Sequence, residues 1–159
     1  MKISKLIKII KEEVNKLAPR IKICKGSFIC RDNDLISLEG APKIVGGYFD
    51  CVNNDLPSLE GAPKIVEGNF GCQYNGLISL EGAPKYVGGD FSCRENNLPS
   101  LKEAPKIVEG HFDCSYNDLN SLEGAPKYVG GIFSCRDNKK KFTKEEVMAV
   151  CEVKGDIYV

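Results

Sequence analysis

Hydrophobic and polar residues recur in this chain at a fixed interval of 21 residues. Six cysteines, from Cys30 to Cys135, recur at this interval. Each follows a phenylalanine by two residues and precedes an asparagine by three. A fixed period of this length is typical of solenoids, in which each repeat forms one turn. The three columns are Phe28, Phe49, Phe70, Phe91, Phe112 and Phe133; Cys30, Cys51, Cys72, Cys93, Cys114 and Cys135; and Asn33, Asn54, Asn75, Asn96, Asn117 and Asn138.

The second half of each repeat carries two leucines and a proline. One unit reads V-x3-F-x-C-x2-N-x-L-x2-L-x3-P, and the sixth copy lacks this second half. The stretch around the proline is Leu-Glu-Gly-Ala-Pro-Lys in four of five copies, with Leu101–Lys106 as the exception. We expect the asparagine amide to bind backbone groups where the chain leaves the strand, which gives every copy the same turn.

The spacing of phenylalanine and cysteine predicts the fold class. Side chains alternate along a strand, so two residues that lie two apart point to the same face. A unit of 21 residues cannot bury its own apolar face, so successive units must stack. We therefore predict a single-domain repeat solenoid over residues 1–159, with a parallel sheet on one side and short turns or extended segments on the other. The six repeats occupy residues 24–138.

Both ends of the chain carry helical signals. Residues 1–19 are predicted to form a helix that covers the first coil and ends at Pro19. Residues 139–159 are predicted to form a C-terminal capping helix, which begins with a capping box of Thr143 and Glu146, and a terminal strand at Asp156–Val159. The apolar stripe of the first helix consists of Ile3, Leu6, Ile7, Ile10, Val14 and Leu17.

Composition narrows the class of protein. The 159 residues include 22 basic and 22 acidic side chains, one His and no Trp, which does not fit a uniformly basic nucleic-acid binder. No apolar run approaches the roughly 18 residues of a membrane helix, and lysines interrupt the first segment where a signal peptide would be apolar. We expect a protein of the cytoplasm that neither spans a membrane nor is exported.

Eight cysteines raise the question of disulfides, metals or catalysis. Stacked cysteines keep their Cβ atoms near about 4.8 Å, outside the usual disulfide range, so we expect free buried thiols and a reducing compartment. No Cys-x2-Cys pair exists, and His111 has the opposite strand parity to Cys114, so we expect no metal site. We expect no catalytic residues, cofactor or small-molecule substrate, because the cysteines lack an adjacent base.

The run Phe49-Asp50-Cys51-Val52-Asn53-Asn54-Asp55-Leu56 resembles the strand half of the leucine-rich repeat. The Leu-Glu-Gly-Ala-Pro-Lys unit, the Phe-Thr-Lys-Glu-Glu-Val helix and the Val-Lys-Gly-Asp-Ile-Tyr-Val ending are similar to small repeat proteins encoded by bacteriophages. This resemblance implies a scaffold that binds a partner on the exposed face of its strands. It also implies a viral protein that blocks or redirects a host factor in the host-cell cytoplasm.

The copies differ most at positions that flank phenylalanine and cysteine, which alternation places toward solvent. Drift at exposed positions explains this variation, but so does selection for a binding surface. These columns, together with the residue after each asparagine, hold nine acids and four bases, so the partner we expect is a protein with a basic surface and not nucleic acid. The predicted partner-binding residues are Arg31, Tyr48, Asp50, Tyr74, Asp90, Arg94, His111, Asp113, Tyr116 and Arg136.

The first 25 residues have the opposite charge, with eight bases and two acids. A basic amphipathic helix can bind nucleic acid or a membrane surface, which is the alternative function. The same apolar stripe is what a capping helix needs, and we favour that interpretation. A thiol-redox enzyme is a third hypothesis, and the oligomeric state cannot be read from the pattern.

Overall fold

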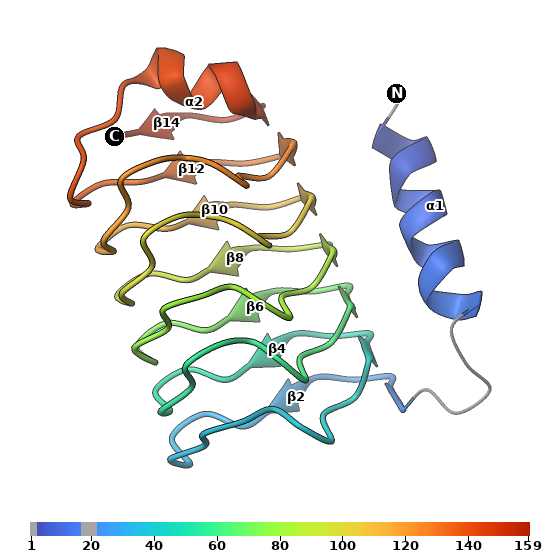
Figure 1. Ribbon diagram of the computed structural model, residues 1–159. Coiled ribbons are helices and arrows are strands. Elements are labelled where there is room, and N and C mark those ends of the chain that lie inside the picture. Colours follow the sequence, from blue (N-terminus) through green and yellow to red (C-terminus); the bar gives the residue numbers. More distant parts are fainter. Residues whose placement is uncertain (1–2, 17–21) are drawn as a thin grey trace.

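The computed structural model describes residues 3–16 and 22–159. The chain winds into a parallel β-solenoid in which each turn of the repeat lies on the one before it (Figure 1). The elements in chain order are α1 (Ile3–Lys16), β1 (Ile23–Cys24), β2 (Phe28–Ile29), β3 (Ile44–Val45), β4 (Phe49–Asp50), β5 (Ile65–Val66), β6 (Phe70–Gly71), β7 (Tyr86–Val87), β8 (Phe91–Ser92), β9 (Ile107–Val108), β10 (Phe112–Asp113), β11 (Tyr128–Val129), β12 (Phe133–Ser134), α2 (Lys144–Val150), β13 (Glu152–Val153) and β14 (Ile157–Tyr158).

The strands form two sheets, not the single sheet expected from the sequence. Sheet A contains the seven odd-numbered strands and sheet B the seven even-numbered strands, each in chain order along the stack. Through the six repeats every residue pairs with its counterpart 21 positions away, as Phe49 does with Phe70 in sheet B and Val45 with Val66 in sheet A. The side expected to hold only turns or extended segments therefore includes a second sheet, made of strands only two residues long.

The core is a set of identical stacks along the solenoid axis. Phenylalanine rings of adjacent coils stack with centroids 5.1 to 5.6 Å apart, and from Phe49 onward the column is at most 1% exposed. Sheet A contributes a buried valine column. The segment that leads from each sheet B strand to the next sheet A strand, which we call the third side of the coil, contributes two leucine columns. The prediction that phenylalanine and cysteine share one interior is confirmed, because alternation along the strand points them the same way, and the leucines of the segment that follows are buried in the same core.

The thiols of the cysteine column are free and point into this core. Several of them donate to the backbone of the following coil, as Cys51 Sγ does to Gly71 O at 3.4 Å and Cys72 Sγ to Ser92 O at 3.3 Å. Burial raises the pKa of these thiols, to about 11 for Cys30 and Cys135. They pack as small hydrophobic side chains with a weak donor.

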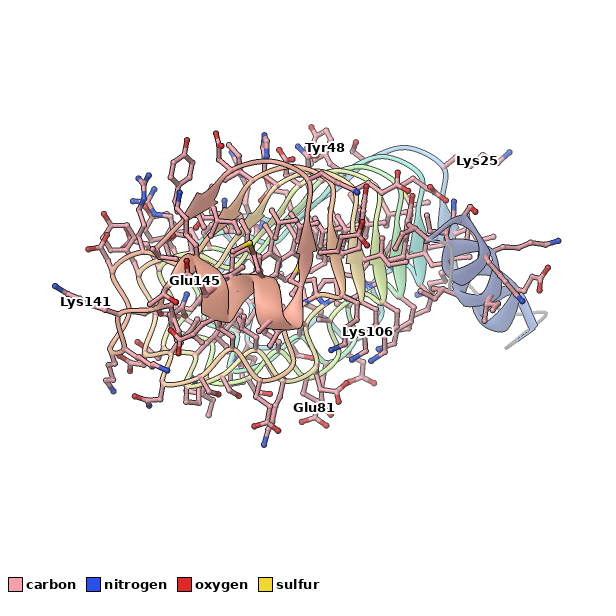
Figure 2. All side chains as sticks on the ribbon, turned by 90° about the horizontal axis from the view of Figure 1, so that it is seen from above. Lys25, Tyr48, Glu81, Lys106, Lys141 and Glu145 are labelled. Atoms are coloured by element: carbon pink, nitrogen blue, oxygen red, sulfur yellow. The ribbon has the colours of Figure 1, made fainter. Side chains whose placement is uncertain are left out.

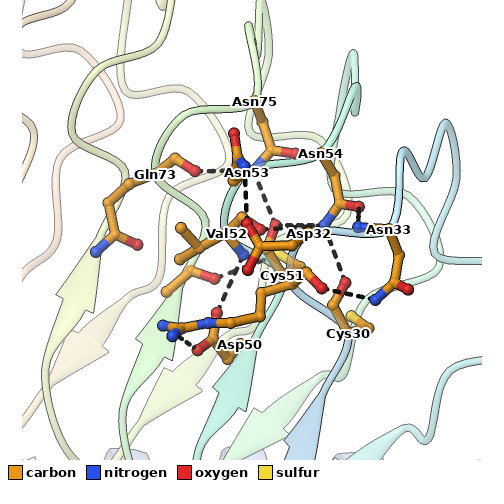
Figure 3. A network of polar contacts seen from close by, with 12 residues as sticks. Cys30, Asp32, Asn33, Asp50, Cys51, Val52, Asn53, Asn54, Gln73 and Asn75 are labelled. Atoms are coloured by element: carbon orange, nitrogen blue, oxygen red, sulfur yellow. Dashed lines mark hydrogen bonds and ion pairs between the residues drawn. The ribbon is translucent and has the colours of Figure 1, made fainter.

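The asparagine column joins neighbouring coils (Figure 3). The Asn54 amide nitrogen donates to the carbonyls of Cys30 and Cys51 at 3.0 Å each, while its oxygen accepts the backbone amides of Asn33 at 3.1 Å and Leu35 at 2.9 Å. The predicted turn role is therefore confirmed. From Asn54 to Asn138 each side chain also donates to a carbonyl of the preceding coil, so the column holds the stack together.

Helix α1 lies along the outside of sheet A and does not cover the first coil as expected (Figure 1). Its buried Ile10 packs on an outward column of sheet A that includes Ile65, Tyr86 and Ile107. Lys11 pairs with Glu67 at 2.9 Å across this contact. The apolar column on the outside of sheet A requires a cover, and Ile3, Ile7 and Ile10 of the helix supply it. Leu17, Pro19 and the side chains of Leu6 and Val14 lie outside the described residues.

The C-terminal segment packs on the last coil. Thr143 and Glu146 form the predicted capping box, and α2 places Val147, with 0% exposure, in the main core beside Phe142. The predicted terminal strand is confirmed as β14, whose Ile157 pairs with Phe133. A strand that the sequence did not indicate, β13, adds Glu152 and Val153 to sheet A.

Candidate interaction face on sheet B

The ten predicted partner-binding residues lie on one side of the molecule, the outer face of sheet B and its two flanking turns. We call this surface the sheet B face. Because Phe and Cys point inward, the residue between them points outward, and the residues on either side form the turns. In the view along the stack, Tyr48 points away from the body on the side that Lys25 also occupies, well away from α1 (Figure 2).

The column that precedes each phenylalanine has a structural task that the sequence did not reveal. Asp90 Oδ1 accepts the His111 amide at 2.8 Å, and His111 Nδ1 accepts the Ile132 amide at 2.8 Å. Ser27 and Asn69 accept the amide of the next coil in the same way. Asp90 and His111 therefore tie one coil to the next, and the groups that do so are unavailable to a partner.

Asp50 and Asp113 are also held by the protein itself. Asp50 Oδ1 accepts the Val52 amide at 3.1 Å, and its second oxygen pairs with Arg31 at 2.7 Å. Asp113 Oδ1 accepts the Ser115 amide at 2.9 Å. These carboxylates fix the turn after each strand by bonding the backbone two residues ahead. Substituting them would test turn stability as well as binding.

Tyrosine and arginine side chains protrude from the sheet B face. Arg94 lies over the Tyr116 ring at 4.6 Å, and Arg136 lies over Tyr158 at 4.3 Å. The Asp137 carboxylate raises the pKa of the Tyr116 phenol. Tyr74, 51% exposed, extends from the turn before them. Stacked arginine and tyrosine are side chains that often anchor protein interfaces, since their flat surfaces bury large area at small entropic cost.

The backbone under two of these tyrosines is unusual. The second residue after each column cysteine adopts a left-handed conformation, with φ of 56° at Tyr74 and 55° at Tyr116. Asp32, Asn53, Glu95 and Asp137 occupy the same position in the other four coils. Aspartate and asparagine tolerate this conformation well, but a bulky side chain there is disfavoured. The local fold therefore does not explain why two copies carry tyrosine.

A shallow depression of about 300 Å³ lies at the N-terminal part of the face. It exists because Gly71 occupies the outward position of β6, where neighbouring coils have Asp50 and Ser92. The oxygen of the Gln73 side chain, at the edge of this hollow, is buried and has no hydrogen-bond partner in the described part of the chain. Further lining residues are Arg31, Tyr48, Asp50, Val52 and Asn69.

Val52, Asn69, Gly71 and Gln73 were not among the residues selected from the sequence. A glycine in an outward strand column was the one available signal, since it removes a side chain between larger neighbours. Tyr158 was also missed, because β14 pairs with β12 at an offset that differs from the 21-residue period. It extends the aromatic row by one coil.

The face keeps the acidic balance predicted from its residue types. Three of its four bases form ion pairs with three of its nine acids, in the pairs Arg31–Asp50, Arg94–Glu95 and Lys139–Asp118. Six acids and Arg136 then have no such ion pair within residues 3–16 and 22–159. The face therefore attracts cations and basic surfaces.

Other chemistry finds little support in the described residues. Within residues 3–16 and 22–159, no group of three or more His, Cys, Asp and Glu side chains converges as metal ligands would. No helix in the described segments has the length and apolar character needed to cross a bilayer. Ile3, Ile7 and Ile10 of the apolar stripe of α1, on which a membrane function would depend, pack against sheet A.

The fold and face define the chain as a two-sheet parallel β-solenoid with an acidic, tyrosine-bearing surface. Comparison of the chain with family models, with curated proteins and with solved structures gave no match.

Proposed function

We propose that this protein is a non-enzymatic scaffold that binds a partner protein through the sheet B face. The observation that carries the proposal is the pair of tyrosines, Tyr74 and Tyr116, in a left-handed turn position that holds Asp32, Asn53, Glu95 and Asp137 in the other four coils. Strained backbone positions persist where the side chain serves a function. Exposed aromatic side chains on a rigid sheet support protein recognition in particular.

The partner in this proposal has a basic surface. Within the described part of the chain, six acids of the face and Arg136 have no ion pair, which favours such a partner, and Arg94 and Arg136 are already stacked on tyrosine rings. Binding of such a partner would weaken as salt concentration rises, because ions screen exposed charges. A leucine-rich-repeat relationship is consistent with partner binding on the strand face, and a phage origin would make the partner a host protein in a reducing compartment.

The test compares capture of partners from the natural cell by the wild-type chain and by a Tyr74→Asn, Tyr116→Asn double variant. Asparagine suits the left-handed turn, as Asn53 shows in the same column, so the variant keeps the fold. Two interface tyrosines together contribute at least about 2 kcal/mol, so we expect about 30-fold weaker binding. The same bound protein must be quantified throughout.

The matched control is Ile78→Asn, which removes a 64% exposed apolar side chain from the third side of the coil. This control should retain the partner at the wild-type level. Equal retention by the double tyrosine variant, or equal loss with the Ile78 variant, would contradict recognition by the sheet B face.

A further inference from the structure

The two ends of the solenoid are finished differently. At the C-terminal end, α2 packs over the last coil and keeps Phe142, Val147 and Ile157 at most 8% exposed. At the N-terminal end, Phe28, Cys30 and Leu35 are only partly buried, although their counterparts one coil later are at most 1% exposed. These three residues line an apolar hollow of about 320 Å³ at the open end.

Within residues 22–159, the backbone at this open end has hydrogen-bonding groups without a partner. The amides of Phe28 and Cys30 donate to Tyr48 and Asp50 of the second coil. Backbone groups alternate in direction along a strand, so those of Ile29 point the opposite way, where the described chain has no earlier coil. In β1 the Cys24 carbonyl accepts the Gly46 amide of the second coil. The backbone groups of Ile23, one residue earlier, therefore point away from the second coil, as those of Ile29 do.

Lys22 and Lys25 flank β1, but the residues within the two edge strands are not those that protect an edge. Monomeric proteins commonly place charges or proline on exposed edge strands to prevent pairing. Strands β1 and β2 contain neither, and instead display Ile23 at 61% exposure and Ile29 at 56%. An exposed apolar edge of two strands, with an apolar hollow beside β2, is typical of an interface.

The charge of the first coil permits contact with an identical surface. Residues 22–42 contain three bases, Lys22, Lys25 and Arg31, and three acids, Asp32, Asp34 and Glu39. Their formal charge is zero, so two such ends can approach without net repulsion. The C-terminal end is not an equivalent partner, because α2 occupies the position that a further coil would take (Figure 1).

We propose that the N-terminal end of the solenoid binds the same end of a second copy of this chain, forming a closed two-fold dimer. The partner must cover the hollow and pair with the edges of both sheets at the same time. It therefore needs a cross-section like that of the solenoid, and the open end of a second copy has one. A two-fold contact uses one patch on both subunits, so it consumes both open ends and stops at two copies. The proposal is independent of partner binding on the sheet B face.

The test is sedimentation of the purified full chain between about 1 and about 100 µM, a range that covers ordinary dimer affinities. We expect a reversible monomer–dimer equilibrium with no larger species. Ile29→Lys should weaken the dimer at least tenfold, because it places a charge at the edge, while an exposed side chain should leave the coil folded. Ile78→Lys, which changes an equally exposed isoleucine on a middle coil, should dimerise like the wild type.

Amide hydrogen exchange then locates the interface. Exchange of the Ile23 and Ile29 amides should slow as concentration rises, while that of Tyr158 at the other end should not change. A chain that stays monomeric at the highest concentration overturns the proposal. So does growth into longer assemblies, which would mean head-to-tail stacking, or a dimer that is unaffected by Ile29→Lys.

Discussion

Replacing Asn75 by alanine tests how much the asparagine column contributes to the stack. Its amide nitrogen donates to the carbonyls of Cys51 at 2.9 Å, Cys72 at 3.1 Å and Gln73 at 3.1 Å, and its oxygen accepts the Leu56 amide at 3.4 Å. All three carbonyls have a second donor in neighbouring side chains or backbone. The substitution therefore leaves one buried group, the Leu56 amide, without a partner.

The expected cost follows from these contacts. An orphaned buried amide costs about 1–3 kcal/mol, and each lost bond to an acceptor that keeps another donor costs less, about 0.5 kcal/mol. Asn75→Ala should therefore lower the free energy of unfolding by about 3 kcal/mol. Asn33→Ala is the matched control, because Asn33 is exposed and, within the described residues, its side-chain amide donates only to the Arg31 carbonyl, at 2.6 Å. We expect it to cost less than about 1 kcal/mol.

Asn75→Asp separates the roles of the two amide atoms. The aspartate keeps an acceptor for the Leu56 amide but turns a second oxygen toward three carbonyls, so it should be worse than alanine at pH 7. Repulsion would raise the folded-state pKa of this carboxyl above its unfolded value. The protonated form can donate, so the variant should be most stable at low pH and lose stability as pH rises through the folded pKa.

Urea unfolding followed by circular dichroism measures all three variants, with a check that each unfolds in one transition, since repeat proteins can unfold in parts. Equal costs at Asn33 and Asn75 would refute the assignment of the column as a bridge between coils. Wild-type stability of Asn75→Asp at pH 7 would refute the assigned donor role.

Three further outcomes can be measured on single variants or on the native chain. Gly82→Ala should lower the free energy of unfolding by about 2–4 kcal/mol, because φ is +89° and an added Cβ would clash with the Leu59 carbonyl oxygen. Gly26→Ala is the control: an added Cβ would meet nothing within 4 Å, so the free energy of unfolding should change by less than about 1 kcal/mol. Alkylation at pH 8 should modify the buried column thiols only on unfolding, because burial raises their pKa and shields them; rapid native labelling would contradict the fold. Ile10→Asp should release α1, seen as faster hydrogen exchange in residues 3–16, with the β-sheet signal retained; an unchanged exchange rate would contradict its packing on sheet A.

The repeat itself made most of the fold predictable. Six copies that agree at Phe, Cys and Asn specify which side chains lie inside, and stacking in register follows from the constant spacing. Sheet A was not predicted because both residues of a strand such as Ile65–Val66 are apolar, so the pattern shows no alternation of apolar and polar positions there. Its outward column, with Ile65 and Tyr86, is apolar, as is one side of α1. Two apolar surfaces without a partner could have been paired with each other, which would have placed the helix correctly.

The site was less predictable, because sequence variation does not distinguish a free side chain from one that performs a common backbone task. Ser27, Asn69, Asp90 and His111 differ in size and charge, yet each accepts the amide of the next coil. Any acceptor of suitable reach serves there, so variation among these four residues needs no binding partner to explain it.

At the position two residues after each column cysteine, the backbone does not explain the variation between copies. The backbone there adopts one left-handed conformation in all six coils, and asparagine or aspartate would satisfy it everywhere. Tyr74 and Tyr116 bring exposed aromatic surface at a conformational cost, and Arg94 packs on one of them. Variation that disagrees with what the local backbone prefers is better evidence for a binding surface than variation alone. By this criterion the tyrosine–arginine row, and not the aspartates, is the part of the sheet B face that a partner would recognise.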